Sequence, residues 1–201
     1  DLRSNVRKGP FPPLKAWNFD FAVSPEGALL ATYGAEDATL RIFSSKDGSA
    51  RADVSSAFLA RRGFKVSRHF VSARGIAFDK LGRNVYSSFP RSGQLSDAGE
   101  LDPITIRVSV DKLSAVYVGR GAPVGWLADS GLVRFFPETI YAGSKWWPRP
   151  EGWFITTDGT HIIGARVTGN RVRIGSFNPR NGALLGSYDI AQLPRGFLVH
   201  K

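Results

Sequence analysis

The fold is decided by the stretch Phe21-Ala-Val-Ser-Pro-Glu-Gly-Ala-Leu-Leu-Ala-Thr-Tyr-Gly34. Its two apolar runs are joined by a turn that reads Ser-Pro-Glu-Gly, and a third run, Ala38-Thr-Leu-Arg-Ile-Phe43, follows closely. Short runs rich in β-branched and aromatic residues, bounded by Gly and Pro, are typical of strands joined by tight turns. The stretch therefore predicts consecutive β-strands.

A second copy of this pattern lies 132 residues further along the chain. It reads Trp153-Phe-Ile-Thr-Thr-Asp-Gly-Thr-His-Ile-Ile-Gly164 and continues through Asn170-Arg-Val-Arg-Ile-Gly175. The displacement aligns Gly27 with Gly159, and Phe21 with Trp153. It is three times 44, and about 40–45 residues is the period of a four-stranded propeller blade.

Two weaker copies lie between these, at Gly75-Ile-Ala-Phe-Asp-Lys-Leu-Gly-Arg-Asn-Val-Tyr86 and Gly125-Trp-Leu-Ala-Asp-Ser-Gly-Leu-Val-Arg-Phe-Phe136. Each of the four copies contains one turn glycine for which we expect a positive φ. These glycines are Gly27, Gly82, Gly131 and Gly159. Their spacings of 55, 49 and 28 residues predict an irregular repeat with a truncated third unit.

Other segments complete the secondary-structure prediction. Ile104 to Val110 alternates as a half-buried strand does, and a long polar loop is expected over residues 90–103. Only Ala50 to Ala60 could form a short helix, and its Val and Ser content disfavours one. The chain is therefore predicted to be nearly all β.

Residues 21–48 resemble a blade of the WD40-like and related bacterial β-propellers, whose Ser-Pro-Asp-Gly turn is here Ser24-Pro-Glu-Gly27. Where a WD40 blade has Trp-Asp, this chain has Phe43-Ser44 and Gly175-Ser176, and no Gly-His dipeptide occurs. The resemblance covers about residues 16–190 and implies an all-β propeller or partial propeller. With about 44 residues per blade, 201 residues give four to five four-stranded blades. A β-sandwich is the alternative fold.

The predicted organisation has three parts. A basic, proline-containing arm is expected over residues 1–15, the propeller-like repeat over residues 16–195, and a short tail over residues 196–201. The ring could close within one chain, be part of a larger propeller, or be completed by other copies in an oligomer or split propeller.

Composition bears on partners and chemistry. The chain carries 27 Lys and Arg against 17 Asp and Glu, a net charge of +10, which favours binding to polyanions such as nucleic acid or an acidic protein. It has no Cys, and its three histidines are scattered. No apolar run approaches the roughly 18 residues of a transmembrane helix. No catalytic residue, metal site or cofactor is predicted. The composition fits either the cytoplasm or a bacterial envelope.

The most basic segment runs from Arg61 to Arg91, with eight Lys and Arg against Asp79 alone. Its first part, Arg61-Arg-Gly-Phe-Lys-Val-Ser-Arg-His-Phe70, interleaves cations with aromatic rings, which suits an acidic partner or exposed bases. The alternative is an edge strand with Phe64, Val66 and Phe70 inward and Lys65, Ser67 and His69 outward. The residues predicted to bind a partner here are Arg61, Arg62, Lys65 and Arg68.

The most aromatic window is Lys145-Trp-Trp-Pro-Arg-Pro-Glu-Gly-Trp153. Its tryptophans could fill the space between blades or form a platform for a sugar ring or a partner's side chain. If Trp146 and Trp147 lie in one strand, alternation directs one of them outward. We include both in the predicted partner-binding site.

These patterns favour a non-enzymatic interaction scaffold, a subunit of a complex that engages an acidic protein or a ribonucleoprotein. A carbohydrate-binding propeller of the bacterial envelope is the alternative, because of the tryptophans. A hydrolase is a second alternative, in which carboxylates from separate blades would meet at the propeller axis. The available acids are Asp97, Glu100 and Asp102 in the long loop and Asp37, Asp129 and Asp158 at turns, and turn formation is their simpler explanation.

Overall fold

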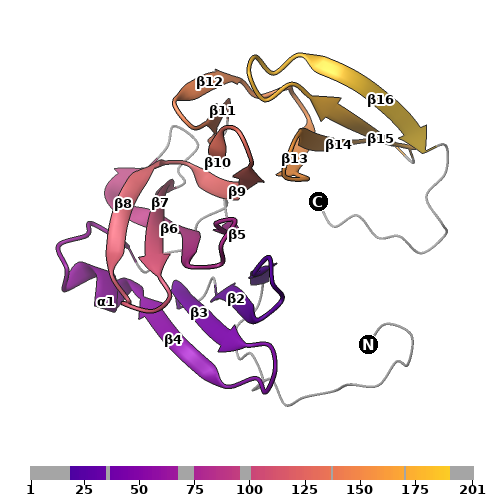
Figure 1. The fold of residues 1–201 in the computed structure, drawn as a ribbon. Coiled ribbons are helices and arrows are strands. Elements are labelled where there is room, and N and C mark those ends of the chain that lie inside the picture. The colour runs from indigo at the N-terminus through magenta and orange to yellow at the C-terminus, as the bar shows by residue number, and fades with distance from the viewer. Residues whose placement is uncertain are drawn as a thin grey trace. The chain divides into compact units, whose positions relative to one another are not determined.

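A computed structural model describes residues 19–34, 37–67, 75–95, 101–136, 138–169 and 171–190 (Figure 1). The predicted arm over residues 1–15 and tail over residues 196–201 lie outside these ranges. The chain divides into two compact units, residues 1–123 and 124–201, and each is described by itself.

Within its described residues, the first unit contains two four-stranded sheets and one short helix. The strands of its first sheet are β1 (Phe19–Val23), β2 (Leu29–Gly34), β3 (Thr39–Ser44) and β4 (Ala50–Ser55). The helix is α1 (Ser56–Ala60). The strands of the second sheet are β5 (Ile76–Phe78), β6 (Asn84–Leu95), β7 (Leu101–Ser109) and β8 (Ala115–Arg120).

The second unit also contains two four-stranded sheets, and strand β9 straddles its boundary with the first unit. The strands of one sheet are β9 (Ala122–Leu127), β10 (Gly131–Phe136), β11 (Thr139–Ala142) and β12 (Lys145–Pro148). Those of the other are β13 (Trp153–Thr157), β14 (Ile162–Thr168), β15 (Arg171–Phe177) and β16 (Leu184–Ile190).

Every sheet is an antiparallel meander in which each strand pairs with the next along the chain, so neighbouring strands have adjacent colours in Figure 1. Three of the four predicted glycines lie in the turn between the first two strands of a sheet, and Gly131 directly follows that turn as the first residue of β10. Their φ angles are all positive: 71° at Gly27, 67° at Gly82, 74° at Gly131 and 94° at Gly159. The predicted repeat and its turn chemistry are confirmed.

Three local predictions need correction. Ala50 to Ala60 is strand β4 followed by helix α1, which begins where the Ser55 hydroxyl accepts a hydrogen bond from the backbone N–H of Phe58. The expected loop over residues 90–103 is largely hairpin, because Leu95 still pairs with Leu101. The third unit is complete, since its four strands of four to six residues fit into a short span.

Each unit has its own apolar core between its two sheets. In the first unit, Leu40, Val54, Ile106 and Phe89 are fully buried, and Phe89 meets the ring of Tyr33 edge-on with centroids 5.4 Å apart. The core of the second unit brings together apolar side chains of both sheets, namely Leu127, Val133, Ile140, Ala142, Trp147, Trp153, Ile162 and Phe177.

One face of sheet β13–β16 packs in this core through Trp153, Ile162 and Phe177, and the opposite face has a row of exposed apolar side chains. The register places Phe154, Ala165, Ile174 and Tyr188 side by side across all four strands. Phe154 is 67% exposed and Tyr188 72% exposed. Among the described residues, this row stays exposed while the other face of the sheet packs in the core.

Candidate binding surfaces

The first candidate surface follows helix α1. The backbone N–H of Phe64 donates to the carbonyl of Leu59, and that of Gly63, at φ 83°, donates to the carbonyl of Ala60. This pair of bonds is a Schellman turn, which ends the helix. Leu59 is fully buried and anchors the turn, while Arg61 and Arg62 are exposed.

The chain beyond the turn pairs with the edge of β6. Val66 forms a bridge with Arg91, and the backbone N–H of Ser67 donates to the carbonyl of Pro90 over 2.8 Å. Phe64 and Val66 pack against the core, and Lys65 is exposed, as the edge-strand alternative expects. The same pattern leaves the cations accessible to a partner, and their role in docking stays a prediction. Arg68 lies outside the described residues.

One of these cations, Arg62, contacts an aromatic ring. The Arg62 guanidinium lies over the Phe58 ring, 3.6 Å from its centroid, in a cation–π contact. Among the described residues, no carboxylate forms an ion pair with Arg61, Arg62 or Lys65. Within the described part of the chain, the cluster therefore presents positive charge without an ion-pair partner, on a backbone held by hydrogen bonds.

The second candidate surface is the tryptophan window, which the structure divides between core and surface. Trp147 is 5% exposed and packs in the core of the second unit, whereas Trp146 is 67% exposed. Trp153 is also buried, with its ring edge-on to Phe177 at 5.0 Å. The predicted alternation along the strand is confirmed.

Trp146 belongs to a polar and aromatic row across its sheet. Its cross-strand neighbour is Tyr141, whose own neighbour is Arg134. The Arg134 guanidinium lies 5.2 Å from the Tyr141 ring centroid. The row combines an exposed indole, a phenol and a cation, a combination that suits stacking on a flat partner.

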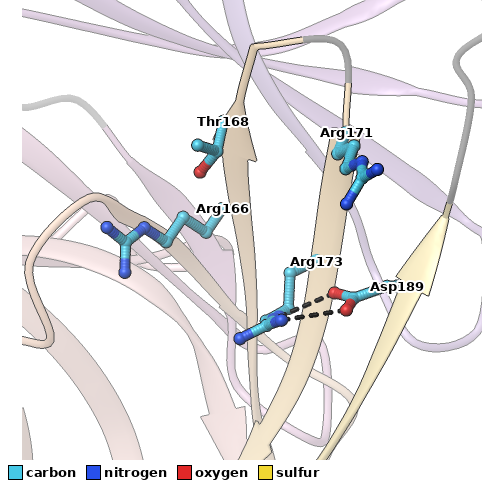
Figure 2. Close-up of a pocket in the computed structure, with 5 residues that line it drawn as sticks. All are labelled: Arg166, Thr168, Arg171, Arg173 and Asp189. Atoms are coloured by element: carbon cyan, nitrogen blue, oxygen red, sulfur yellow. Dashed lines mark hydrogen bonds and ion pairs between the residues drawn. The ribbon is translucent and has the colours of Figure 1, made fainter.

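A third surface was missed by the sequence analysis, a pocket of about 240 Å³ in the last sheet (Figure 2). Strand β14 contributes Arg166 and Thr168, strand β15 contributes Arg171 and Arg173, and strand β16 contributes Asp189. The register pairs Arg166 with Arg173, Thr168 with Arg171, and Arg173 with Asp189, so all five lie on one face. We call these five residues the arginine pocket.

An ion pair organises one side of the arginine pocket. Arg173 Nε donates to Asp189 Oδ1 over 2.6 Å, and a second guanidinium nitrogen donates to Oδ2 over 2.9 Å. These bonds lower the pKa of the Asp189 carboxyl and raise the pKa of Arg173, and the nearby Arg171 lowers the Asp189 pKa further. Asp189 therefore stays ionised and holds Arg173 in place.

Acidic residues at turns have structural partners. Asp158 accepts hydrogen bonds from the backbone N–H groups of Thr160 and His161, and these lower the pKa of its carboxyl. His161 is exposed just before β14, with Nδ1 3.4 Å from Asp158 Oδ2. In the part of the chain that the structure describes, no three His, Cys, Asp or Glu side chains cluster as a metal site would need. None of the described helices is long and apolar enough to cross a membrane.

Comparison with known proteins bears on the fold alone. No protein-family model matches the chain, and no curated protein matches it. Among solved structures it is similar to a chain of a nidogen–laminin complex, with a TM-score of 0.57 and 14% identity over 89% of this chain and 66% of that one. It is also similar to the β-propeller domain of Cps50 (Swd1) from Myceliophteria thermophila, with a TM-score of 0.50 and 13% identity over 88% of this chain and 56% of that one.

These similarities agree with the four meander sheets. The chain spans about two thirds of the first chain and just over half of the second. The sandwich alternative does not apply, because the strands form four separate four-stranded sheets. The chain is a partial β-propeller of four four-stranded blades.

Proposed function

We propose that this chain is a non-enzymatic, WD40-like interaction scaffold whose basic surface binds an acidic protein or ribonucleoprotein partner within a complex. The observation that carries the proposal is the cluster Arg61, Arg62 and Lys65, exposed and without an ion-pair partner among the described residues. Propellers commonly serve as rigid platforms whose loops bind other proteins, although a fold does not by itself set a function.

The local backbone favours this role. The Schellman turn after α1 and the pairing of residues 65–67 with β6 fix where the three cations lie. A preorganised loop loses little conformational entropy on binding, so more of the contact energy appears as affinity. Exposed positive charge also speeds encounter with an acidic surface, an effect that salt weakens.

Reversing the charge of this cluster tests the proposal. We expect the triple variant Arg61→Glu, Arg62→Glu, Lys65→Glu to bind a fluorescent polyglutamate peptide at least about tenfold more weakly than wild type, measured by anisotropy at low salt. A single-stranded oligonucleotide, titrated in parallel, distinguishes a ribonucleoprotein partner from a purely acidic protein.

The matched control is Lys46→Glu, Lys80→Glu, Lys112→Glu, which changes the net charge equally at three exposed lysines of the same unit. We expect it to weaken binding far less than the cluster variant does. An equal loss in both variants would mean that only net charge matters, and the proposal would be wrong.

A second candidate function, carbohydrate binding, is favoured by the exposed indole of Trp146 beside Tyr141. If it applies, an oligosaccharide panel should contain a ligand that quenches tryptophan fluorescence and binds independently of salt. Trp146→Ala should then abolish that binding while the charge-reversed cluster leaves it intact. Saturable sugar binding that survives Trp146→Ala would exclude this surface.

A further inference from the structure

The arginine pocket has more positive than negative side chains. Three arginines and one aspartate line it, an excess of two positive charges. The register places Arg166 directly opposite Arg173, and like charges in that position destabilise a sheet. Asp189 pairs with Arg173, and among the described residues neither Arg166 nor Arg171 forms an ion pair. The arrangement is electrostatically incomplete.

The side chains of the two opposed arginines point apart (Figure 2). In Figure 2 the Arg173 guanidinium lies against Asp189, whereas Arg166 extends from β14 away from that ion pair. The Arg166 guanidinium passes Gly152, because a Cβ at that position would lie 3.4 Å from its Nε. Arg166 is an exposed, long side chain and can turn back if an anion neutralises the strand pair.

The first repeat unit shows which of these charges belong to the blade itself. A displacement of 132 residues relates Arg173 to Arg41, and each has an aspartate opposite it on the next strand, Asp189 and Asp53 respectively. The arginine–aspartate pair is therefore shared by both blades.

The other two arginines are not shared. Arg166 lies opposite Arg173, whereas the residue opposite Arg41 in the first blade is Thr32. The position equivalent to Arg171 holds Thr39, and the first blade forms the same four-stranded meander. Its Arg41 lies opposite Asp53 and forms an ion pair with Asp37, so that blade has no surplus of positive charge at this place. Arg166 and Arg171 are thus additions that the fold does not require.

We propose that the arginine pocket is a binding site for a phosphate-class oxyanion. Guanidinium groups present forked N–H donors that match phosphate oxygens, and the Thr168 hydroxyl lies on the same face as a further donor. Asp189 holds Arg173 in position. The volume of about 240 Å³ lies below the range for drug-sized ligands, so the site suits a phosphate group on a small carrier.

The test is a titration followed by ³¹P NMR and calorimetry, with inorganic phosphate and methyl phosphate as probes. We expect saturable one-site binding to wild type. The double variant Arg166→Gln, Arg171→Gln should bind at least about tenfold more weakly, because two of the three forked donors are lost. Comparing the two probes distinguishes a site for free phosphate from one for a phosphate monoester.

Two controls separate this site from general attraction to a basic protein. Arg41→Gln, Arg51→Gln removes the same charge from the first sheet and should leave the affinity unchanged. Arg166→Lys, Arg171→Lys keeps the charge without the fork and should retain only part of the affinity. Absence of saturable binding to wild type, or an equal loss in the first control, would overturn the proposal. The polyglutamate test of the first unit is unaffected by either result.

Discussion

Replacing Trp147 by Ala is expected to lower the free energy of unfolding by about 3–5 kcal/mol. Trp147 is 5% exposed, and its cross-strand neighbour Ile140 is fully buried in the same core. Gly182 lies flush against the indole, since a Cβ there would be 2.1 Å from Trp147 Cδ1. Truncation would leave a cavity that the surrounding strands cannot fill without shifting. Urea denaturation followed by circular dichroism measures the loss.

Trp146→Ala is the matched control, because it removes the same side chain one residue earlier on the same strand. Trp146 is 67% exposed, and surface substitutions of this kind usually change stability by less than about 0.5 kcal/mol. Equal losses in the two variants would mean that Trp146 is also packed in the native protein. A large loss of stability in Trp147→Ala and a small one in Trp146→Ala would instead show that Trp147 stabilises the core and that Trp146 is available for binding.

Much of the fold follows from the repeat. The 132-residue displacement and the four turn glycines locate all four blades, because tight turns between short strands need specific backbone conformations that Gly supplies. The orientation of the two adjacent tryptophans follows from the period of two along a strand. Both features depend on residues close together in the chain, so they can be predicted from a single sequence.

The features that the sequence analysis missed depend on how the strands pair and how short their turns are. The third blade, marked as truncated from the spacing of Gly131 and Gly159, contains four strands because its turns are short. The polar residues after Pro90 extend a hairpin, since pairing with β7 satisfies their backbone better than a loop would. The polar composition of that segment therefore predicted a loop where the chain forms a hairpin.

Part of the arginine pocket could have been predicted from a turn signal in the sequence. The connection between β14 and β15 is the dipeptide Gly169-Asn170, which is typical of a two-residue hairpin turn. Such a turn sets Thr168 opposite Arg171 and Arg166 opposite Arg173, which is the observed register. Asp189, 16 residues after Arg173, could be assigned to the same face only once the register of β16 was known.

Gly75→Ala is expected to destabilise the first unit by about 3 kcal/mol. A Cβ at this position would lie 1.8 Å from the backbone carbonyl oxygen of Pro123, well inside contact distance. The glycine cannot move aside easily, because its N–H donates to the Ser88 hydroxyl and its carbonyl accepts from the Ser88 N–H, each over 3.1 Å. One methyl group must therefore displace the backbone of Pro123 or break both bonds to Ser88.

The control is Gly186→Ala in strand β16, where no atom of the described residues, apart from the glycine and its two chain neighbours, lies within 4 Å of the added methyl group. That change should be neutral or stabilising by up to about 1 kcal/mol, because Ala restricts the unfolded chain more than Gly does. Thermal denaturation followed by circular dichroism compares the two variants directly. If Gly75→Ala melts at the wild-type temperature, Pro123 does not pack against Gly75 as described, and the end of β8 and the start of β9 are arranged differently. A large loss confined to Gly75→Ala would establish that steric contact, and not the general cost of replacing glycine, keeps this position free of a side chain.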